Sequence, residues 1–157
     1  INEYYIKNLN EKKLYEVFKL YAETYKKKIN EKYERNLINS IYFLKNKAKK
    51  LEDIYKNAQY IFLDTIVIPE EEKKLLNGNA KKIIADFLNE YEKKDNLRKD
   101  NLEKIVKNLI DNNKTNFKGV GQPLRIALTG SKFGPGLYDI ILSLDKKDVV
   151  TRLKMIK

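Results

Sequence analysis

The residues best suited to chemistry gather in residues 119–136, GVGQPLRIALTGSKFGPG, which hold five of the six glycines and two of the three prolines of this 157-residue chain. A phosphate loop is the first possibility for such a stretch. Gly119 and Gly121 match the start of the dinucleotide-binding pattern GxGxxG, but Leu124 stands where its third glycine belongs, and no strand is expected before it. The P-loop order of glycine, lysine and serine or threonine is absent as well. We therefore exclude nucleotide binding of either kind.

An active site in the same stretch would have to rely on Thr129, Ser131 or Lys132. The chain contains no histidine and no cysteine, which removes imidazole bases, thiolate nucleophiles, disulfides and the usual zinc ligands. Asp139 is the nearest carboxylate, and we expect it in the middle of a helix. These residues argue against catalysis and against a metal site here. The missing cysteines are consistent with a cytoplasmic protein.

A surface that reads a ligand fits the stretch better. Leu124 and Leu128 can bury one face of a short helix, which leaves Arg125 on the opposite side. Gly130 can end that helix in the left-handed conformation, and Pro135 can open the next one. An arginine forks onto a base edge with two hydrogen bonds, and the N–H groups at a helix start attract an anion. The stretch suits an unpaired base and its phosphate, but it could equally be no more than a compact corner.

The charge distribution favours a polyanionic partner. The net charge is +11, and residues 114–157 carry nine cations and three anions, whereas residues 1–78 carry sixteen and twelve. More than half of the excess therefore lies in the last 44 residues. Lysine provides 29 of the 33 cations, which also indicates a compositional bias, and the runs at 26–28 and 45–50 are typical of solvated helix faces. We favour nucleic acid over a merely basic surface.

The elements that must position these residues are helical, because apolar residues follow a helical period along almost the whole chain. This predicts an all-α fold. The first three faces comprise Leu14, Val17, Phe18, Tyr21 and Tyr25; Tyr33, Leu37, Ile41 and Leu44; and Leu51, Ile54, Tyr55, Ala58, Ile61 and Phe62. Later helices are predicted from Pro69 and at 80–93, 101–112, 121–129, 136–144 and 146–154. We expect most of the eleven tyrosines in the core.

Polar residues mark the expected helix ends. We predict N-caps at Asn10, Asn30, Asp100 or Asn101, and Asp145, and a helix stop at Asn77 followed by Gly78. A boundary within 66–79 divides the chain into two helical subdomains, 1–68 and 69–157. No apolar run approaches the ~20 residues that span a bilayer. The chain starts at Ile1 and its only methionine is Met155, so we expect a piece of a longer protein.

The sequence QPLRIALTG of residues 122–130 closely resembles the C-terminal anticodon-binding region of bacterial glutamyl-tRNA synthetases. That family's motif is approximately PLRxALTG…GP…L…L..LG…V…RL. Gly134 and Pro135, residues 140–144, and then Val149, Arg152 and Leu153 continue it in order and spacing, with Asp145 in place of the usual glycine. Earlier segments agree more loosely. They are Asn2, Tyr5, Ile6 and Leu9, and residues 44–54, which are similar to a basic RxKTLxEL junction.

The resemblance implies an all-helical anticodon-binding domain in two subdomains, the C-terminal helical cage of a class I aminoacyl-tRNA synthetase. Such an enzyme joins glutamate to tRNA with ATP and Mg²⁺, through nucleotide-binding signatures of the HIGH and KMSKS types. Neither signature occurs in this chain, and HIGH needs a histidine. The chain alone should therefore bind tRNA, attach no glutamate to it and need no cofactor.

Carried over by position, Arg125 would contact an anticodon base, with Gly134, Pro135 and Leu137 lining the pocket beside it. Lys47, Lys49 and Lys132 would also bind tRNA. Lys47 falls where many family members have an arginine that reads another anticodon base. Since a lysine is a point charge without the planar fork, acceptance of tRNA-Gln beside tRNA-Glu stays open.

Three hypotheses remain side by side. The leading one is a monomeric, cytoplasmic anticodon-binding domain for tRNA-Glu within a glutamate–tRNA ligase. The second is a basic helical protein-interaction or scaffold domain without RNA specificity. The third, a free-standing enzyme, is disfavoured because we expect the chain to attach no glutamate to tRNA.

Overall fold

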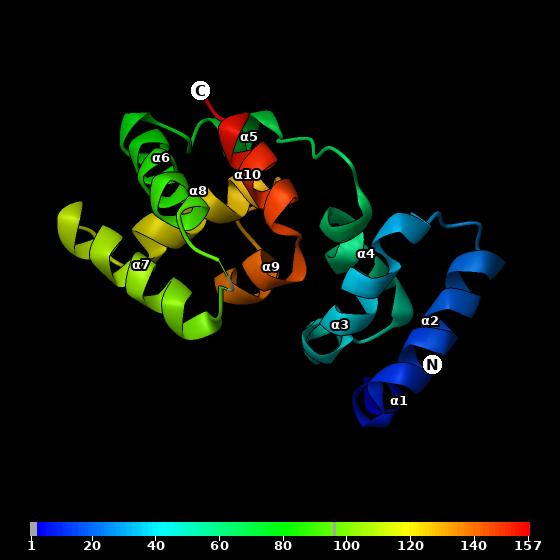
Figure 1. Cartoon of the computed structure of the whole chain (residues 1–157). Helices are drawn as coiled ribbons and strands as arrows, with labels where there is room; N and C mark the ends of the chain where they lie inside the picture. Colours follow the sequence, from blue (N-terminus) through cyan, green and yellow to red (C-terminus); the bar gives the residue numbers. More distant parts are fainter. Residues whose placement is uncertain (1–2, 96) are drawn as a thin grey trace. The chain divides into compact units, whose positions relative to one another are not determined.

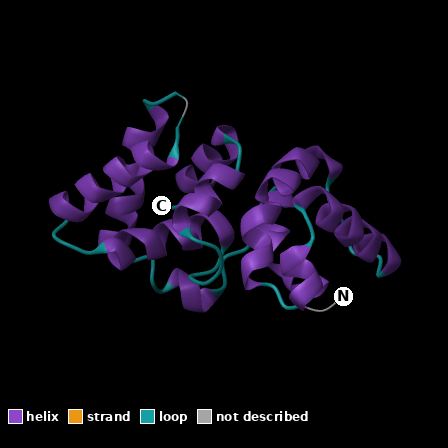
Figure 2. Cartoon of the chain, turned by 90° about the horizontal axis from the view of Figure 1, so that it is seen from below, coloured by secondary structure: helices purple, strands orange, loops and turns teal. Residues whose placement is uncertain are grey.

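The structure is a computed structural model that describes residues 3–95 and 97–157, so the expected role of Asn2 lies outside the described residues. Every regular element within these two ranges is a helix, and none is a strand (Figure 2). The predicted all-α fold is confirmed. None of the helices in the described part of the chain is both long and apolar enough to cross a membrane.

The chain forms two compact units, Ile1–Asp64 and Thr65–Lys157, each with its own core (Figure 1). The first unit contains four α-helices and two short 3₁₀ segments among its described residues: α1 (Glu3–Asn8), α2 (Glu11–Thr24), η1 (Glu31–Tyr33), α3 (Glu34–Leu44), η2 (Lys45–Lys47) and α4 (Leu51–Phe62). The second unit contains α5 (Glu70–Lys73), α6 (Gly78–Glu92), α7 (Lys99–Asn112), α8 (Phe117–Thr129), α9 (Leu137–Ser143) and α10 (Lys146–Lys154).

The core of the first unit lies where α2, α3 and α4 pack together. Leu14 and Phe18 of α2 and Ile41 of α3 are fully buried there, as the helical period predicts. Asn10 is the N-cap of α2, since its side chain accepts a hydrogen bond from the Lys13 N–H at 2.8 Å. The expected apolar face of α2 does not extend to Tyr25, which is 66% exposed.

The core of the second unit is organised around α8, against which α6, α7, α9 and α10 pack. Its side chains Val120, Leu124, Ile126 and Leu128 are fully buried. This helix begins at Phe117, four residues before the predicted start, because Asn116 caps it by accepting a hydrogen bond from the Gly119 N–H at 2.8 Å. Gly119, which the prediction left outside the helix, therefore lies inside it together with Gly121.

Several predicted helix ends need correction. Asn77 is not a stop but the N-cap of α6, where its side chain accepts from the Ala80 N–H at 3.0 Å. The helix α7 starts after Arg98, and the Asn101 side chain reaches back to accept the Arg98 N–H. Pro135 does not open α9; Gly136 is its N-cap. Asp145 does hold the predicted N-cap position of α10.

The expectation that most tyrosines lie in the core is wrong. Four of the eleven are buried, namely Tyr15, Tyr33, Tyr60 and Tyr91. Four others are exposed: Tyr4, Tyr5, Tyr25 and Tyr42. A tyrosine is amphipathic, so a place at helical spacing does not decide whether its ring faces the core or the solvent.

Candidate functional site

The C-terminal end of α8 and the turn to α9, residues 125–137, form the corner that the sequence singles out. The helix ends at Gly130, whose φ is 84° and whose N–H donates to the Ile126 carbonyl at 2.8 Å. Glycine is required there for two reasons. Its backbone is left-handed, and a Cβ at this position would collide with the Val67 carbonyl oxygen. The end of α8 therefore rests directly on the backbone of residues 67–68.

Arg152 of α10 holds the same helix end from the interior. It is 4% exposed, and its Nη1 donates a hydrogen bond to the Leu128 carbonyl at 2.7 Å. The last carbonyls of a helix lack intrahelical donors, and a cation stabilises the negative end of the helix dipole. Arg152, which matched the family motif only by position, is thus a buried support for the corner.

The turn after α8 is organised by short hydroxyl contacts. Thr129 Oγ1 donates to the Arg125 carbonyl at 2.8 Å and accepts from the Ser131 N–H at 3.1 Å. Ser131 Oγ in turn accepts from the Phe133 N–H at 3.1 Å. These bonds fix the backbone between α8 and the next residues, so the polar side chains of the turn serve its shape.

Arg125 lies one turn before the end of α8 and is half-buried. Its Nε is buried and has no hydrogen-bond partner within the described residues. None of the described acidic side chains forms an ion pair with it. A buried donor without an acceptor costs about 1–3 kcal/mol, so an acceptor that reached this Nε would stabilise the side chain.

The other predicted site residues of the second unit differ in exposure. Lys132 is half-buried, with its Nζ 5.2 Å from the centroid of the Phe133 ring. Gly134 has a φ of 128° and open space around it. Pro135 and Leu137 are buried, so they shape the corner from below and offer little surface to a ligand.

Lys47 and Lys49, the remaining predicted residues, lie in the first unit and are both exposed. Lys47 ends η2, and the Lys49 N–H donates to Asp53 Oδ2 at 2.9 Å. Hydrogen bonds from the Lys49 and Lys50 amides lower the pKa of the Asp53 carboxyl, which stays ionised at the start of α4. The basic segment 45–50 is therefore anchored through its backbone while these two side chains face solvent.

Sequence reasoning missed Phe133, which is 73% exposed beside Lys132. Its only signal was an aromatic residue within a glycine-rich turn, where no periodicity applies.

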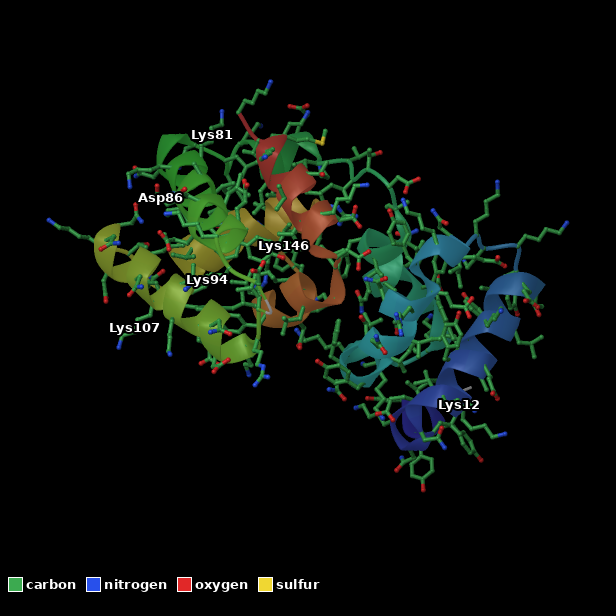
Figure 3. The ribbon with its side chains drawn as sticks, viewed as in Figure 1. Lys12, Lys81, Asp86, Lys94, Lys107 and Lys146 are labelled. Atoms are coloured by element: carbon green, nitrogen blue, oxygen red, sulfur yellow. The ribbon has the colours of Figure 1, made fainter. Side chains whose placement is uncertain are left out.

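Lysines elsewhere also differ in role. Lys81 and Lys107 project from α6 and α7, whereas Lys146 Nζ donates to the Glu92 and Lys94 carbonyls at 3.2 and 2.5 Å (Figure 3). Some of the lysines therefore donate hydrogen bonds to carbonyls at a helix end, as Lys146 does at the end of α6, instead of projecting into solvent.

Comparisons with known proteins find relatives over almost the whole chain. A family model described as an anticodon binding domain matches residues 6–157. The chain is 52% identical over 153 residues to the glutamate–tRNA ligase of Pelagibacter ubique, covering 98% of this chain and 33% of that protein. It is 32% identical to the glutamate–tRNA ligase 2 of a Nitratiruptor species, covering 100% and 33%. The chain thus spans about a third of the length of these relatives.

Solved structures show the same fold. The crystal structure of a glutamate tRNA ligase from Elizabethkingia meningosepticum in complex with its amino acid superposes with a TM-score of 0.81 at 17% identity, over 99% of this chain and 30% of that one. A glutamate–tRNA synthetase from Elizabethkingia anophelis gives a TM-score of 0.66.

The helical architecture and the family match together define the class: this chain belongs to the anticodon-binding domain family. Its curated relatives are bacterial glutamate–tRNA ligases, which are aminoacyl-tRNA synthetases. The predicted resemblance to their anticodon-binding region is confirmed, and the scaffold alternative is not favoured.

Proposed function

We propose that this chain binds the anticodon loop of tRNA-Glu and that Arg125 contacts one anticodon base. The observation that carries the proposal is the buried, unpartnered Nε of Arg125, at the position where the family motif has its arginine. Anticodon bases are unpaired and can be splayed out, so their edges are accessible to a guanidinium. A base edge or phosphate oxygen would supply the acceptor that the described residues do not.

In this proposal the fold acts by holding the RNA-binding side chains in place. Gly130 and Arg152 fix the end of α8, and α8 fixes the half-buried Arg125. Lys132 and Lys49 are proposed phosphate contacts, which hold an RNA backbone without reading its sequence. Lys47 is proposed to lie beside another anticodon base, where many family members have an arginine. Gly134 leaves open space beside the turn, so a ribose or base can approach the backbone closely there.

The rest of the ligase reaction is proposed for the whole protein, because this chain covers only a third of its relatives. We propose that the remaining part attaches glutamate using ATP and Mg²⁺. Residues 3–95 and 97–157 contain no cluster of three or more acidic side chains that could hold a metal ion, so we assign no step in this chain to Mg²⁺. We also propose that the two compact units are the two anticodon-binding subdomains, and that the protein acts as a cytoplasmic monomer.

The proposal is tested by titrating a tRNA-Glu transcript with Arg125→Ala, Arg125→Lys and the unchanged chain. A bidentate base contact is worth about 1–3 kcal/mol, so Arg125→Ala should raise the Kd by roughly 5- to 150-fold. Arg125→Lys should recover little, because it keeps the charge and loses the fork. Arg35→Ala removes an exposed arginine of α3 and serves as the matched control.

An affinity for tRNA-Glu that Arg125→Ala leaves equal to the Arg35→Ala control would overturn the assignment of Arg125. A tRNA-Gln transcript used as competitor in the same titration measures the choice between the two tRNAs. A Kd that does not change with salt concentration would favour the scaffold alternative, because phosphate contacts release counterions.

A further inference from the structure

A second surface, in the first unit, has chemistry that the family motif does not explain. A cavity of about 660 Å³ opens between α2 and the start of α4. It is lined by Val17, Leu20, Tyr21, Thr24, Tyr25, Lys27, Lys50, Leu51 and Glu52. We refer to this as the Tyr25 cavity.

The Tyr25 cavity presents aromatic surface that the core does not use. The rings of Tyr21 and Tyr25 lie 5.0 Å apart between centroids, and Tyr21 in turn packs on the fully buried Phe18 at 6.5 Å. Tyr25 is 66% exposed and Leu20 is 64% exposed. The ring of Tyr25 packs against Tyr21 at an interplanar angle of 45°, so an inner aromatic side chain supports one side of it while the rest stays open to a ligand.

The charges around the Tyr25 cavity favour an anion. Lys27 and Lys50 line it, and Lys50 is the last residue of the basic segment that contains Lys47 and Lys49. Glu52 is the one acid among the described residues of the lining, and its carboxylate oxygens lie 3.9 Å from Lys50 Nζ and 3.4 Å from Lys56 Nζ. The local charge is therefore positive, and the cavity continues the segment that we propose as a phosphate contact.

We infer that the Tyr25 cavity binds an unpaired base of the tRNA, stacked on Tyr25, with Lys27 and Lys50 beside the adjacent phosphates. This inference rests on the proposed function, since it requires RNA as the partner. A nucleobase is a flat aromatic ring attached to a negatively charged phosphate backbone. It therefore matches the exposed ring of Tyr25 with lysines beside it. Base–aromatic stacking is tolerant of base identity, so this contact adds affinity without reading sequence.

The test compares Tyr25→Leu and Tyr25→Phe in titrations with a synthetic anticodon stem-loop of tRNA-Glu. Leucine keeps the apolar character and removes the π-face, whereas phenylalanine keeps the π-face. Tyr25→Leu should weaken binding by about 5- to 150-fold, the usual effect of losing one stacked base, and Tyr25→Phe should bind as the unchanged chain does. Tyr4→Leu, at an exposed tyrosine outside the cavity, is the control. Circular dichroism establishes that each variant stays folded.

An abasic scan identifies the stacked nucleotide. Replacing each loop nucleotide in turn by an abasic one should reveal a position whose loss weakens the unchanged chain but not Tyr25→Leu. A loop without such a position overturns the inference, because the two changes then act independently. Equal weakening by Tyr25→Leu and Tyr25→Phe overturns it as well, since the hydroxyl rather than the ring would carry the contact.

The failures of the two proposals look different. If Arg125→Ala weakens binding while Tyr25→Leu does not, the anticodon proposal stands and the Tyr25 cavity has another occupant, such as a protein surface. If the unchanged chain does not bind the stem-loop at all, both proposals fail together.

Discussion

At the scale of single residues, two arginines of the second unit have opposite roles. Arg152 is buried and has its acceptor, the Leu128 carbonyl, at 2.7 Å. Arg125 is half-buried, and its Nε has no acceptor within the described residues. The same type of side chain thus supports the fold in one place and lacks an acceptor for its Nε in the other, and the two positions differ both in burial and in hydrogen-bond partners.

The supporting role predicts that a change of Arg152 lowers the stability of the second unit. Arg152→Met keeps the apolar stem and removes the donor, so the free energy of unfolding should fall by about 1.5–3 kcal/mol, the range for hydrogen bonds to charged groups. Chemical denaturation measures this loss. Lys147→Met, at an exposed position of the same helix, should change stability little. Equal losses in the two variants would contradict the prediction.

The sequence could identify Arg125 but not its surroundings. A motif identifies the residue by its position, but whether its Nε finds an acceptor depends on the folded structure. Contacts of the same corner also come from segments far along the chain, such as residues 67–68 behind Gly130. Tyr25 shows the same limit. Its spacing placed it on the apolar face of α2, yet it lies beyond the end of that helix at Thr24 and remains exposed.

At the scale of elements, the sequence predicted which segments are helical better than where they begin. The faces through Leu14 and Phe18, and through Leu37 and Ile41, are buried as expected. The start of α8 was missed because glycine is normally a weak helix former. Here a Cβ at Gly119 would collide with the Thr115 side chain, so close packing explains that glycine inside the helix.

The glycine at the end of α8 makes a testable prediction. Gly130→Ala must adopt a left-handed backbone, which costs about 1–2 kcal/mol for an L-residue, and its Cβ must also displace the Val67 carbonyl. The free energy of unfolding should therefore fall by at least that amount, which chemical denaturation measures. Gly78→Ala, at the start of α6 with nothing within 4 Å, should be neutral or slightly stabilising. An unchanged free energy of unfolding in Gly130→Ala would contradict the prediction, because the backbone around residue 130 would then accommodate a Cβ without cost.

At the scale of the whole molecule, stability should fall in alkali in both units. Burial raises the pKa of Tyr15 in the first unit to about 12, with a further contribution from Glu34, and burial raises the pKa of Tyr91 in the second unit to about 12. In the unfolded chain these phenols ionise near their ordinary pKa of 10.0. The stabilisation from keeping them neutral is thus complete below pH 10 and is lost as the pH rises toward 12.

Thermal unfolding followed across this pH range measures the effect. Tyr15→Phe and Tyr91→Phe remove the ionisable group, so each variant should lose less stability between about pH 10 and 12 than the unchanged chain does. Lysine deprotonation is common to all three proteins and cancels in the comparison. Identical pH profiles for the variants and the unchanged chain would contradict the assignment.

The contact between Gly130 and Val67 also limits how the chain can be shortened. The second compact unit begins at Thr65, only two residues before the carbonyl on which Gly130 rests. A truncation meant to isolate that unit must therefore retain Val67 and Ile68, even though they belong to no helix. A chain that begins at Pro69, the first residue of the subdomain that the sequence suggests, would keep every described helix of the unit. It would lack the Val67 and Ile68 backbone against which Gly130 packs.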